Sequence, residues 1–129
     1  MNEYAYLDHN ATTALRPAAI EAMTAALALT GNPSSVHGPG RAARRLLETA
    51  RQRVAALVGA AAADVIFTSG GTEANNLAIL GTLAARPAKR HIVTTAVEHV
   101  SVHSLAERLA GQGYRVTFLA VDSEGSLDT

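Results

Sequence analysis

The sequence predicts an α/β fold built on a parallel sheet, and two observations predict it. After Gly59, short runs of strand-forming residues alternate with segments of helical periodicity, and the connections between them are short. The order strand, helix, strand, helix, strand implies parallel strands joined by right-handed crossovers. The expected strands are residues 65–68, 91–95 and 115–121, and the expected helices are residues 72–83 and 101–110.

The first half of the chain predicts two helices and a loop. "RPAAIEAMTAALAL" has a proline near a helix start and apolar residues at helical spacing, so we expect a helix that ends at Gly31. "GNPSSVHGPG" is rich in glycine, proline, serine and asparagine, which predicts a loop. Residues 40–58 carry one apolar and one charged face, which predicts the longest helix. Residues 4–8 read as a short extended segment.

Composition limits the classes of function. The chain has 129 residues, 48% of them hydrophobic and 17% charged, which indicates one globular unit able to bury a core. A formal net charge of +0 and a pI near 7.0 give no electrostatic footprint for nucleic acid or an anionic membrane. The start lacks the features of a signal peptide, and no apolar run is long enough to cross a bilayer. We therefore expect a cytoplasmic protein with neither nucleic-acid nor membrane partners.

Cysteine is absent from the chain. Disulfides, thiolate metal sites and a nucleophilic thiol are therefore excluded within these residues. We predict no metal site.

The stretch "VIFTSGGTEANNLAIL" joins the first predicted strand to a helix. In a parallel sheet, ligands bind beyond the carboxyl ends of the strands, where helix N-termini present free N–H groups. Gly70 and Gly71 allow a tight turn, and Thr72 adds a hydroxyl, so the stretch can hold an anion such as phosphate. Helix capping by Ser69 or Thr72 explains the same residues equally well.

Two further stretches carry candidate site residues. His99, in "TTAVEHVSVH", follows the strand at 91–95 and could stack on a flat ligand or move a proton, although a surface histidine before a helix is the simpler explanation. "LDHNATT" combines polar side chains between an extended segment and a helix, where capping by Thr13 is the simpler explanation.

Four motifs occur in a specific order: "YLDHNATT", "GNPSSVHGPGR", "FTSGGTEANNLAI" and "EHVSV". Together they resemble the N-terminal part of the cysteine desulfurases, which are pyridoxal-phosphate enzymes of the class V aminotransferase group. The resemblance covers the chain from Tyr6 to its end. It implies a partial three-layer α/β sandwich with mainly parallel strands. Residues 1–14 would belong to the small domain of the enzyme and residues 15–129 to an incomplete cofactor-binding large domain.

The resemblance also implies roles for individual residues. Gly71 and Thr72 would bind the phosphate of pyridoxal 5′-phosphate. His99 would lie against the pyridine ring and assist proton transfer as a catalytic residue. The substrate side of the pocket would be bordered by Asn10, Ala11 and Thr12, and the loop 31–40 would approach the entrance of the active site.

In that family the reaction converts L-cysteine to L-alanine and leaves a persulfide on an enzyme cysteine, for iron–sulfur cluster assembly or thio-modification. The resemblance implies a homodimer and a sulfur-acceptor protein as partners. The cofactor acts as an electron sink, and the protein supplies a Schiff-base lysine and a thiol. The chain has no cysteine and its single lysine, Lys89, precedes the strand at 91–95, so it should lie at the wrong end of that strand.

We therefore expect an N-terminal fragment of a desulfurase that is inactive by itself. The alternatives are a selenocysteine lyase, another class V aminotransferase, or a non-catalytic half-fold that binds a phosphorylated ligand or a partner chain.

Overall fold

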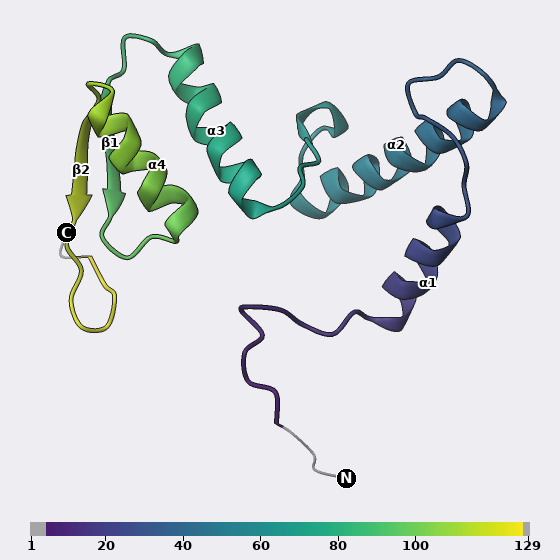
Figure 1. Cartoon of the computed structure of the whole chain (residues 1–129), viewed down its shortest axis with the longest axis horizontal. Coiled ribbons are helices and arrows are strands. Elements are labelled where there is room, and N and C mark those ends of the chain that lie inside the picture. The colour runs from purple at the N-terminus through teal and green to yellow at the C-terminus, as the bar shows by residue number, and fades with distance from the viewer. Residues whose placement is uncertain (1–4, 128–129) are drawn as a thin grey trace. The chain divides into compact units, whose positions relative to one another are not determined.

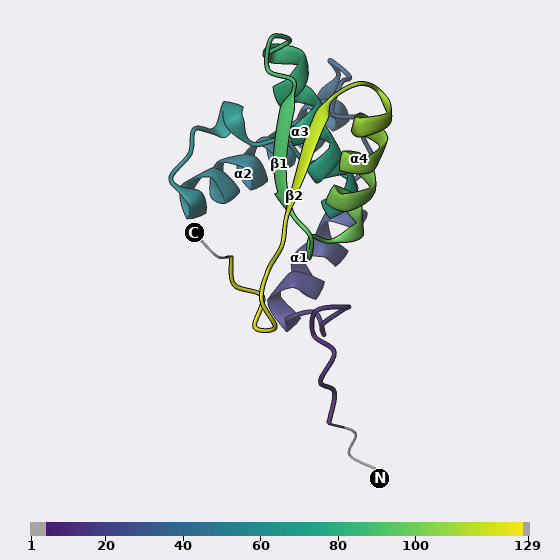
Figure 2. The same cartoon turned by 90° about the vertical axis from the view of Figure 1, so that its left-hand side faces the viewer.

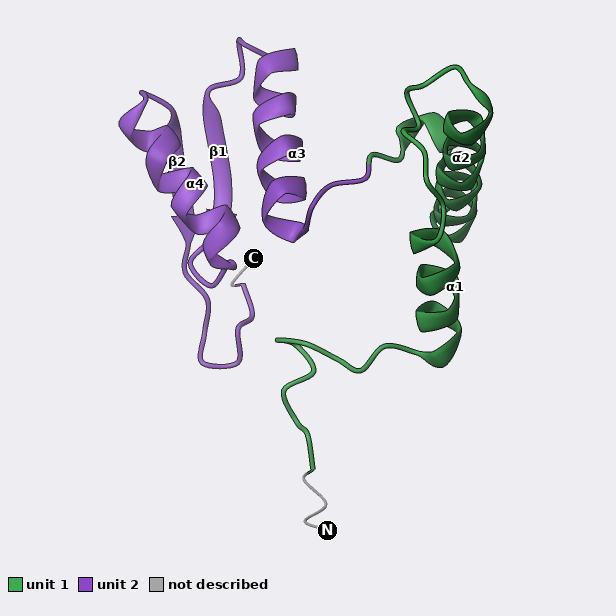
Figure 3. Ribbon diagram, turned by 45° about the vertical axis from the view of Figure 1, so that its right-hand side comes forward, with its two compact units in different colours: residues 1–66 green, residues 67–129 purple. Residues whose placement is uncertain are grey.

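The computed structural model describes residues 5–127 and divides the chain into two compact units, Met1–Ile66 and Phe67–Thr129 (Figure 3). This division replaces the single globular unit expected from composition. The predicted boundary after residue 14 concerns the domains of a longer enzyme and stays a prediction. Tyr4, the first residue of the expected extended segment, lies outside the described residues, and residues 5–8 form neither strand nor helix.

The first unit contains helices α1 (Pro17–Leu27) and α2 (Gly38–Val58) and a short 3-10 helix, η1 (Ala62–Asp64). Proline starts α1 because its fixed φ suits the first helical position and its missing N–H needs no partner there. The helix ends before the predicted Gly31, since the Leu29 N–H bonds to the Ala26 carbonyl at 3.1 Å in a tightened turn.

Helix α2 is the longest helix, as predicted, and both of its ends have caps. At the start, His37 Nδ1 accepts a hydrogen bond from the Gly40 N–H at 3.3 Å. At the end, Gly59 adopts the left-handed conformation with φ 66°, which glycine reaches without a Cβ clash. Ala55, on the apolar face, is buried.

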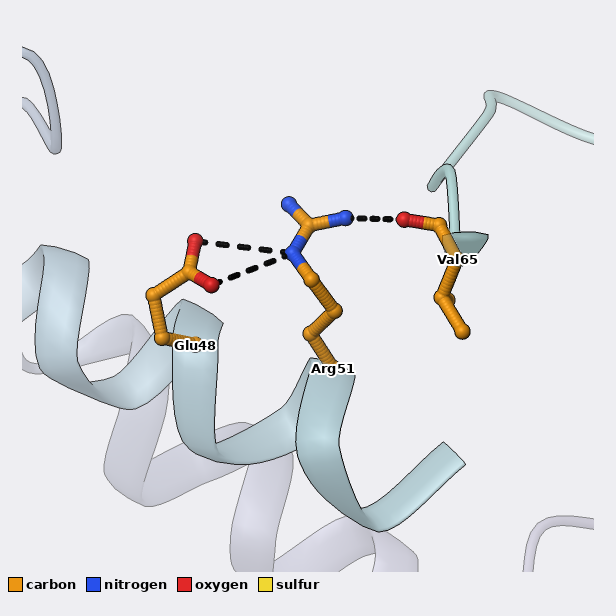
Figure 4. A network of polar contacts seen from close by, with 3 residues as sticks. All are labelled: Glu48, Arg51 and Val65. Atoms are coloured by element: carbon orange, nitrogen blue, oxygen red, sulfur yellow. Dashed lines mark hydrogen bonds and ion pairs between the residues drawn. The ribbon is translucent and has the colours of Figure 1, made fainter. Parts of the chain in front are cut away.

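Arg51 ties the segment after α2 back to the helix (Figure 4). Its Nε donates to the two carboxylate oxygens of Glu48 at 3.3 and 3.4 Å, and its guanidinium also donates to the Val65 carbonyl. The Glu48 side chain is 48% exposed, so the ion pair contributes less than about 1 kcal/mol. The bond to Val65 matters more for the fold, because it joins the chain beyond η1 to the helix.

The loop between α1 and α2 packs closely on the first turn of α2. A Cβ on Gly40 would lie 2.6 Å from the Ser35 carbonyl oxygen and 2.7 Å from that of Asn32. A Cβ on Gly31 would lie 2.4 Å from the Pro39 carbonyl oxygen. Both positions therefore require glycine because backbone atoms fill the space of a side chain.

The second unit contains α3 (Gly71–Ala85), β1 (His91–Thr95), α4 (Val100–Gly111) and β2 (Arg115–Leu119). The two strands pair in parallel, in a register that runs from His91 opposite Arg115 to Thr95 opposite Leu119 (Figures 1 and 2). The Ala96 N–H extends this pairing to the Leu119 carbonyl at 2.9 Å. The α/β class and the parallel pairing of these strands are confirmed.

The core of the second unit forms where α3, β1 and α4 meet. Leu105, Ala106 and Leu109 of α4 are buried, and burial of each leucine is worth about 1.5–3 kcal/mol. A small cavity of about 180 Å³ lies between residues of all three elements: Ile79, Ile92, Val93, Thr94, Val102, Ala106 and Leu109. The cover over β1 is incomplete, since Val93 is 55% exposed.

The predicted strand at residues 65–68 is wrong. These residues form no ladder in the described part of the chain, where the sheet consists of β1 and β2 alone. Val65 has extended dihedral angles, with φ −90° and ψ 121°, but its carbonyl accepts from Arg51 rather than from a strand. An apolar β-prone run becomes a strand only when another strand supplies hydrogen bonds.

The other predicted elements are confirmed with small differences at their ends. The strand expected at 115–121 ends at Leu119, and Val121 instead makes an isolated antiparallel bridge with Leu127. Within residues 5–127, we find no helix with the length and hydropathy needed to cross a membrane.

The close packing of Gly40 against the loop backbone can be tested by substitution. We expect Gly40→Ala to destabilise the first unit by about 1–3 kcal/mol, because the added Cβ overlaps two backbone oxygens that cannot move independently. Urea unfolding monitored by circular dichroism measures the loss. Gly38→Ala is the matched control, since a Cβ there meets no atom within 4 Å. Equal midpoints for the two variants would contradict the close packing.

Candidate functional site

The N-terminus of α3 offers backbone donors. Gly70 is the N-cap, and its carbonyl accepts from the Ala74 N–H at 3.1 Å, which is the first bond of the helix. The N–H groups of Gly71, Thr72 and Glu73 precede this bond and have no acceptor inside the helix. Together with the positive end of the helix dipole, these groups suit an anion.

Glu73 bonds backward to Ser69 rather than to these amides. Its Oε2 accepts from the Ser69 hydroxyl at 2.6 Å and from the Ser69 N–H at 2.7 Å. These two bonds, the hydroxyl bond first, lower the pKa of Glu73 from its ordinary value of 4.5. The carboxylate thus fixes the turn before the helix and leaves the amides of Gly71 and Thr72 to other acceptors.

His99 is the N-cap of α4, directly after the carboxyl end of β1. Its backbone is extended, with φ −57° and ψ 146°, and its Nδ1 accepts from the Ser101 N–H at 3.1 Å. Thr95, the last residue of β1, donates to Glu98 Oε1 at 3.2 Å and so closes the turn between strand and helix. His99 therefore lies directly before a helix, as its simpler explanation required, and one of its ring nitrogens caps that helix.

The second turn of α3 contacts the first turn of α4 through two asparagines. Asn75 Nδ2 donates to the Ser101 hydroxyl at 2.9 Å, and Asn76 Nδ2 donates to the Ser101 carbonyl at 3.4 Å. A groove of about 380 Å³ lies between the helices and is lined by Thr72, Asn76, Val100, Ser101, Ser104, Leu105 and Arg108. The two helix starts therefore lie together beside one groove.

The predicted site residues fall into two groups. Thr72 lines this groove, and His99 contacts the groove residue Ser101 without lining the groove itself. Residues 10–12 lie in the first unit, in a turn where the N–H groups of Ala11 and Thr12 bond to the Asp8 carbonyl at 3.1 and 3.3 Å. The roles of all these residues remain predictions.

Asn75 and Ser101 are polar residues of this site that sequence reasoning did not select. Ser101 is buried, with 7% exposure, and Asn75 reaches it from another helix. A local signal was present, since a serine two residues after an N-cap histidine can bond to that histidine's ring. The asparagine gave no local signal, because its partner lies far along the chain.

Comparison with known proteins identifies the family of the chain. The chain matches the family described as "Aminotransferase class-V" over residues 5–129. It is 49% identical over 124 residues to a cysteine desulfurase of Nostoc sp., a match that covers 95% of this chain and 31% of that protein.

Two solved structures share the fold. A NifS-like protein superposes with a TM-score of 0.87 at 34% identity, covering 94% of this chain and 34% of its own. A structure described as SspA in complex with cysteine superposes with a TM-score of 0.81 at 32% identity, covering 88% of this chain and 33% of its own. The chain belongs to the class V aminotransferase family. Its sequence relatives within that family are cysteine desulfurases, and it spans about a third of their length.

The Ser69–Glu73 bonds predict a pH dependence. Because folding lowers the pKa of Glu73, its stabilising contribution is present above pH 4.5 and is lost as the pH falls through the lowered value. Ser69→Ala should raise the pKa of Glu73 toward 4.5, though not completely, since the backbone N–H still donates. NMR titration, followed at the carboxyl carbon of Glu73, measures the pKa of this residue in the wild-type chain and in the Ser69→Ala variant.

Thr68→Ala is the matched control for Ser69→Ala. Its hydroxyl bonds to the Gly70 carbonyl at 3.1 Å and not to Glu73. An equal rise of the Glu73 pKa in both variants would show that the Ser69 hydroxyl is not the cause.

Proposed function

We propose that this chain is the N-terminal part of a pyridoxal-phosphate-dependent cysteine desulfurase, and that it contributes the phosphate-binding helix start and the ring-facing histidine. The observation that carries the proposal is the joining of two helix starts, one with Thr72 and one with His99, through hydrogen bonds to Ser101. The family match and the desulfurase relatives support the same assignment.

The donor set at the start of α3 fits a phosphate group. Unbonded amides of Gly71 and Thr72, the Thr72 hydroxyl and the helix dipole all favour a dianion. Arg108 lines the same groove and adds a positive charge to it. The Glu73 carboxylate would oppose an anion if it faced these amides, but it bonds to Ser69 instead.

The cofactor, once bonded to the amino group of its substrate, would supply an electron sink for cleavage of the carbon–sulfur bond of L-cysteine. His99 would lie against the pyridine ring and hold or move a proton at its second ring nitrogen, Nε2. Asn10, Ala11 and Thr12 would border the substrate. The similar structure described as SspA in complex with cysteine supports this substrate class.

Lys89 does not fit the role of a covalent cofactor ligand. It lies in the turn before β1, where its N–H bonds to the Arg86 carbonyl at 2.9 Å. His99 follows the other end of β1, and five residues of strand at roughly 3.3 Å each separate the two ends by well over 10 Å. A complete desulfurase would need a lysine and a cysteine from other residues, and this chain by itself would bind the cofactor only weakly and without a covalent bond.

Phosphate binding at α3 can be tested on the purified chain. We expect inorganic phosphate and pyridoxal phosphate both to shift the amide resonances of Gly71 and Thr72 in ¹⁵N–¹H NMR spectra. Thr72→Val should weaken the binding about tenfold, equal to about 1.4 kcal/mol, because it removes one hydrogen bond to a charged group.

Thr82→Val is the matched control, since Thr82 lies in the last turns of the same helix. It should leave the affinity for phosphate unchanged. Shifts that centre on another helix start, or equal affinities for the two variants, would show that α3 is not the phosphate site.

A further inference from the structure

Ser101 is the buried polar side chain on which the two helix starts converge. It is the second residue of α4 and is 7% exposed. Its hydroxyl oxygen lies 2.8 Å from His99 Nδ1 and 2.9 Å from Asn75 Nδ2. The protons of this cluster can be assigned from the chemistry of the donors.

A backbone hydrogen bond selects the tautomer of the neutral imidazole. The Ser101 N–H can only donate, and it points to His99 Nδ1 at 3.1 Å. Nδ1 must therefore carry a lone pair, so in the neutral ring the proton resides on Nε2. The Ser101 hydroxyl, at 2.8 Å from the same nitrogen, then also donates to Nδ1.

Asn75 makes this assignment self-consistent. When the Ser101 hydroxyl donates its proton to His99, its oxygen can accept from Asn75 Nδ2. If the Asn75 amide were turned, its oxygen would take the hydroxyl proton. The lone pairs of Ser101 Oγ and His99 Nδ1 would then face each other at 2.8 Å, which is unfavourable. One direction of donation satisfies all three groups.

We propose that Asn75 and Ser101 are positioning residues that hold the neutral imidazole of His99 in the tautomer with the proton on Nε2. This inference rests on the proposed role of His99 and deepens it. The N–H and the hydroxyl of Ser101 both donate to Nδ1 of His99. Nε2 is therefore the ring nitrogen that remains to donate a proton to a ligand or to take one from it. Burial of the serine excludes water that would compete for the same bonds.

The test reads the tautomer directly, by the ¹⁵N chemical shifts of the two ring nitrogens of His99 in the purified chain at neutral to mildly alkaline pH. The wild-type chain should show an unprotonated, hydrogen-bonded Nδ1 and a protonated Nε2. In Ser101→Ala the two shifts should move toward those of histidine in an unfolded peptide, because one of two donors is lost. Ser101→Thr, which keeps the hydroxyl, should restore the wild-type shifts.

Two asparagines give a matched pair that leaves the serine in place. Asn75→Ala should move the ¹⁵N chemical shifts of the His99 ring part of the way toward those of an unfolded peptide, since the Ser101 hydroxyl loses the donor that orients it. Asn76→Ala should leave these chemical shifts unchanged, because Asn76 bonds to the Ser101 carbonyl and to the Thr72 carbonyl, not to the hydroxyl. This pair keeps the test valid if Ser101→Ala fails to fold.

A wild-type Nδ1 that carries the proton, ring shifts equal to those of an unfolded peptide, or equal shifts in the Asn75 and Asn76 variants would overturn the proposal. No phosphate compound is present in these measurements. The result is therefore independent of whether α3 binds the cofactor, and failure of one proposal can be distinguished from failure of the other.

Discussion

The parallel pairing of β1 with β2 is the constraint on which the second unit depends. Two consecutive strands can run parallel only if a crossover connection brings the chain back to the end of the sheet where the first strand began. Here α4 forms that crossover. The return fixes which residues meet at each end of the sheet. His99 begins the crossover and lies after the carboxyl end of β1, whereas Lys89 precedes its amino end. The separation of these two residues is thus a property of topology and not of side-chain packing.

Hydrogen bonds to Ser101 join the starts of α3 and α4. Apolar residues of α4 fill the core, but the first turn of the helix is held to α3 by hydrogen bonds to Ser101. Hydrogen bonds have direction, so they fix the rotation of one helix about its axis more closely than apolar contacts do. Such a junction suits a site in which one helix start would hold an anion and the other would aim an imidazole.

The sequence was sufficient to predict elements defined by their own residues and insufficient for those that depend on partners. Helix α2 has an apolar face and glycine at its end, and it forms where predicted. Residues 65–68 have strand propensity without a pairing strand, and they form no ladder. The same division applies to the site: glycines and Thr72 were visible as a motif, while Asn75 gained its importance from a serine on another helix.

The close packing of the loop between α1 and α2 makes it fold together with the helix. The atoms that exclude a side chain at Gly31 and Gly40 belong to the backbone of the loop and of the first turn of α2. The native conformation of each segment therefore depends on the backbone of the other. Surface loops commonly open locally at little cost, but opening this one would also unwind the first turn of α2. In hydrogen exchange, the loop and that turn should exchange as one cooperative unit.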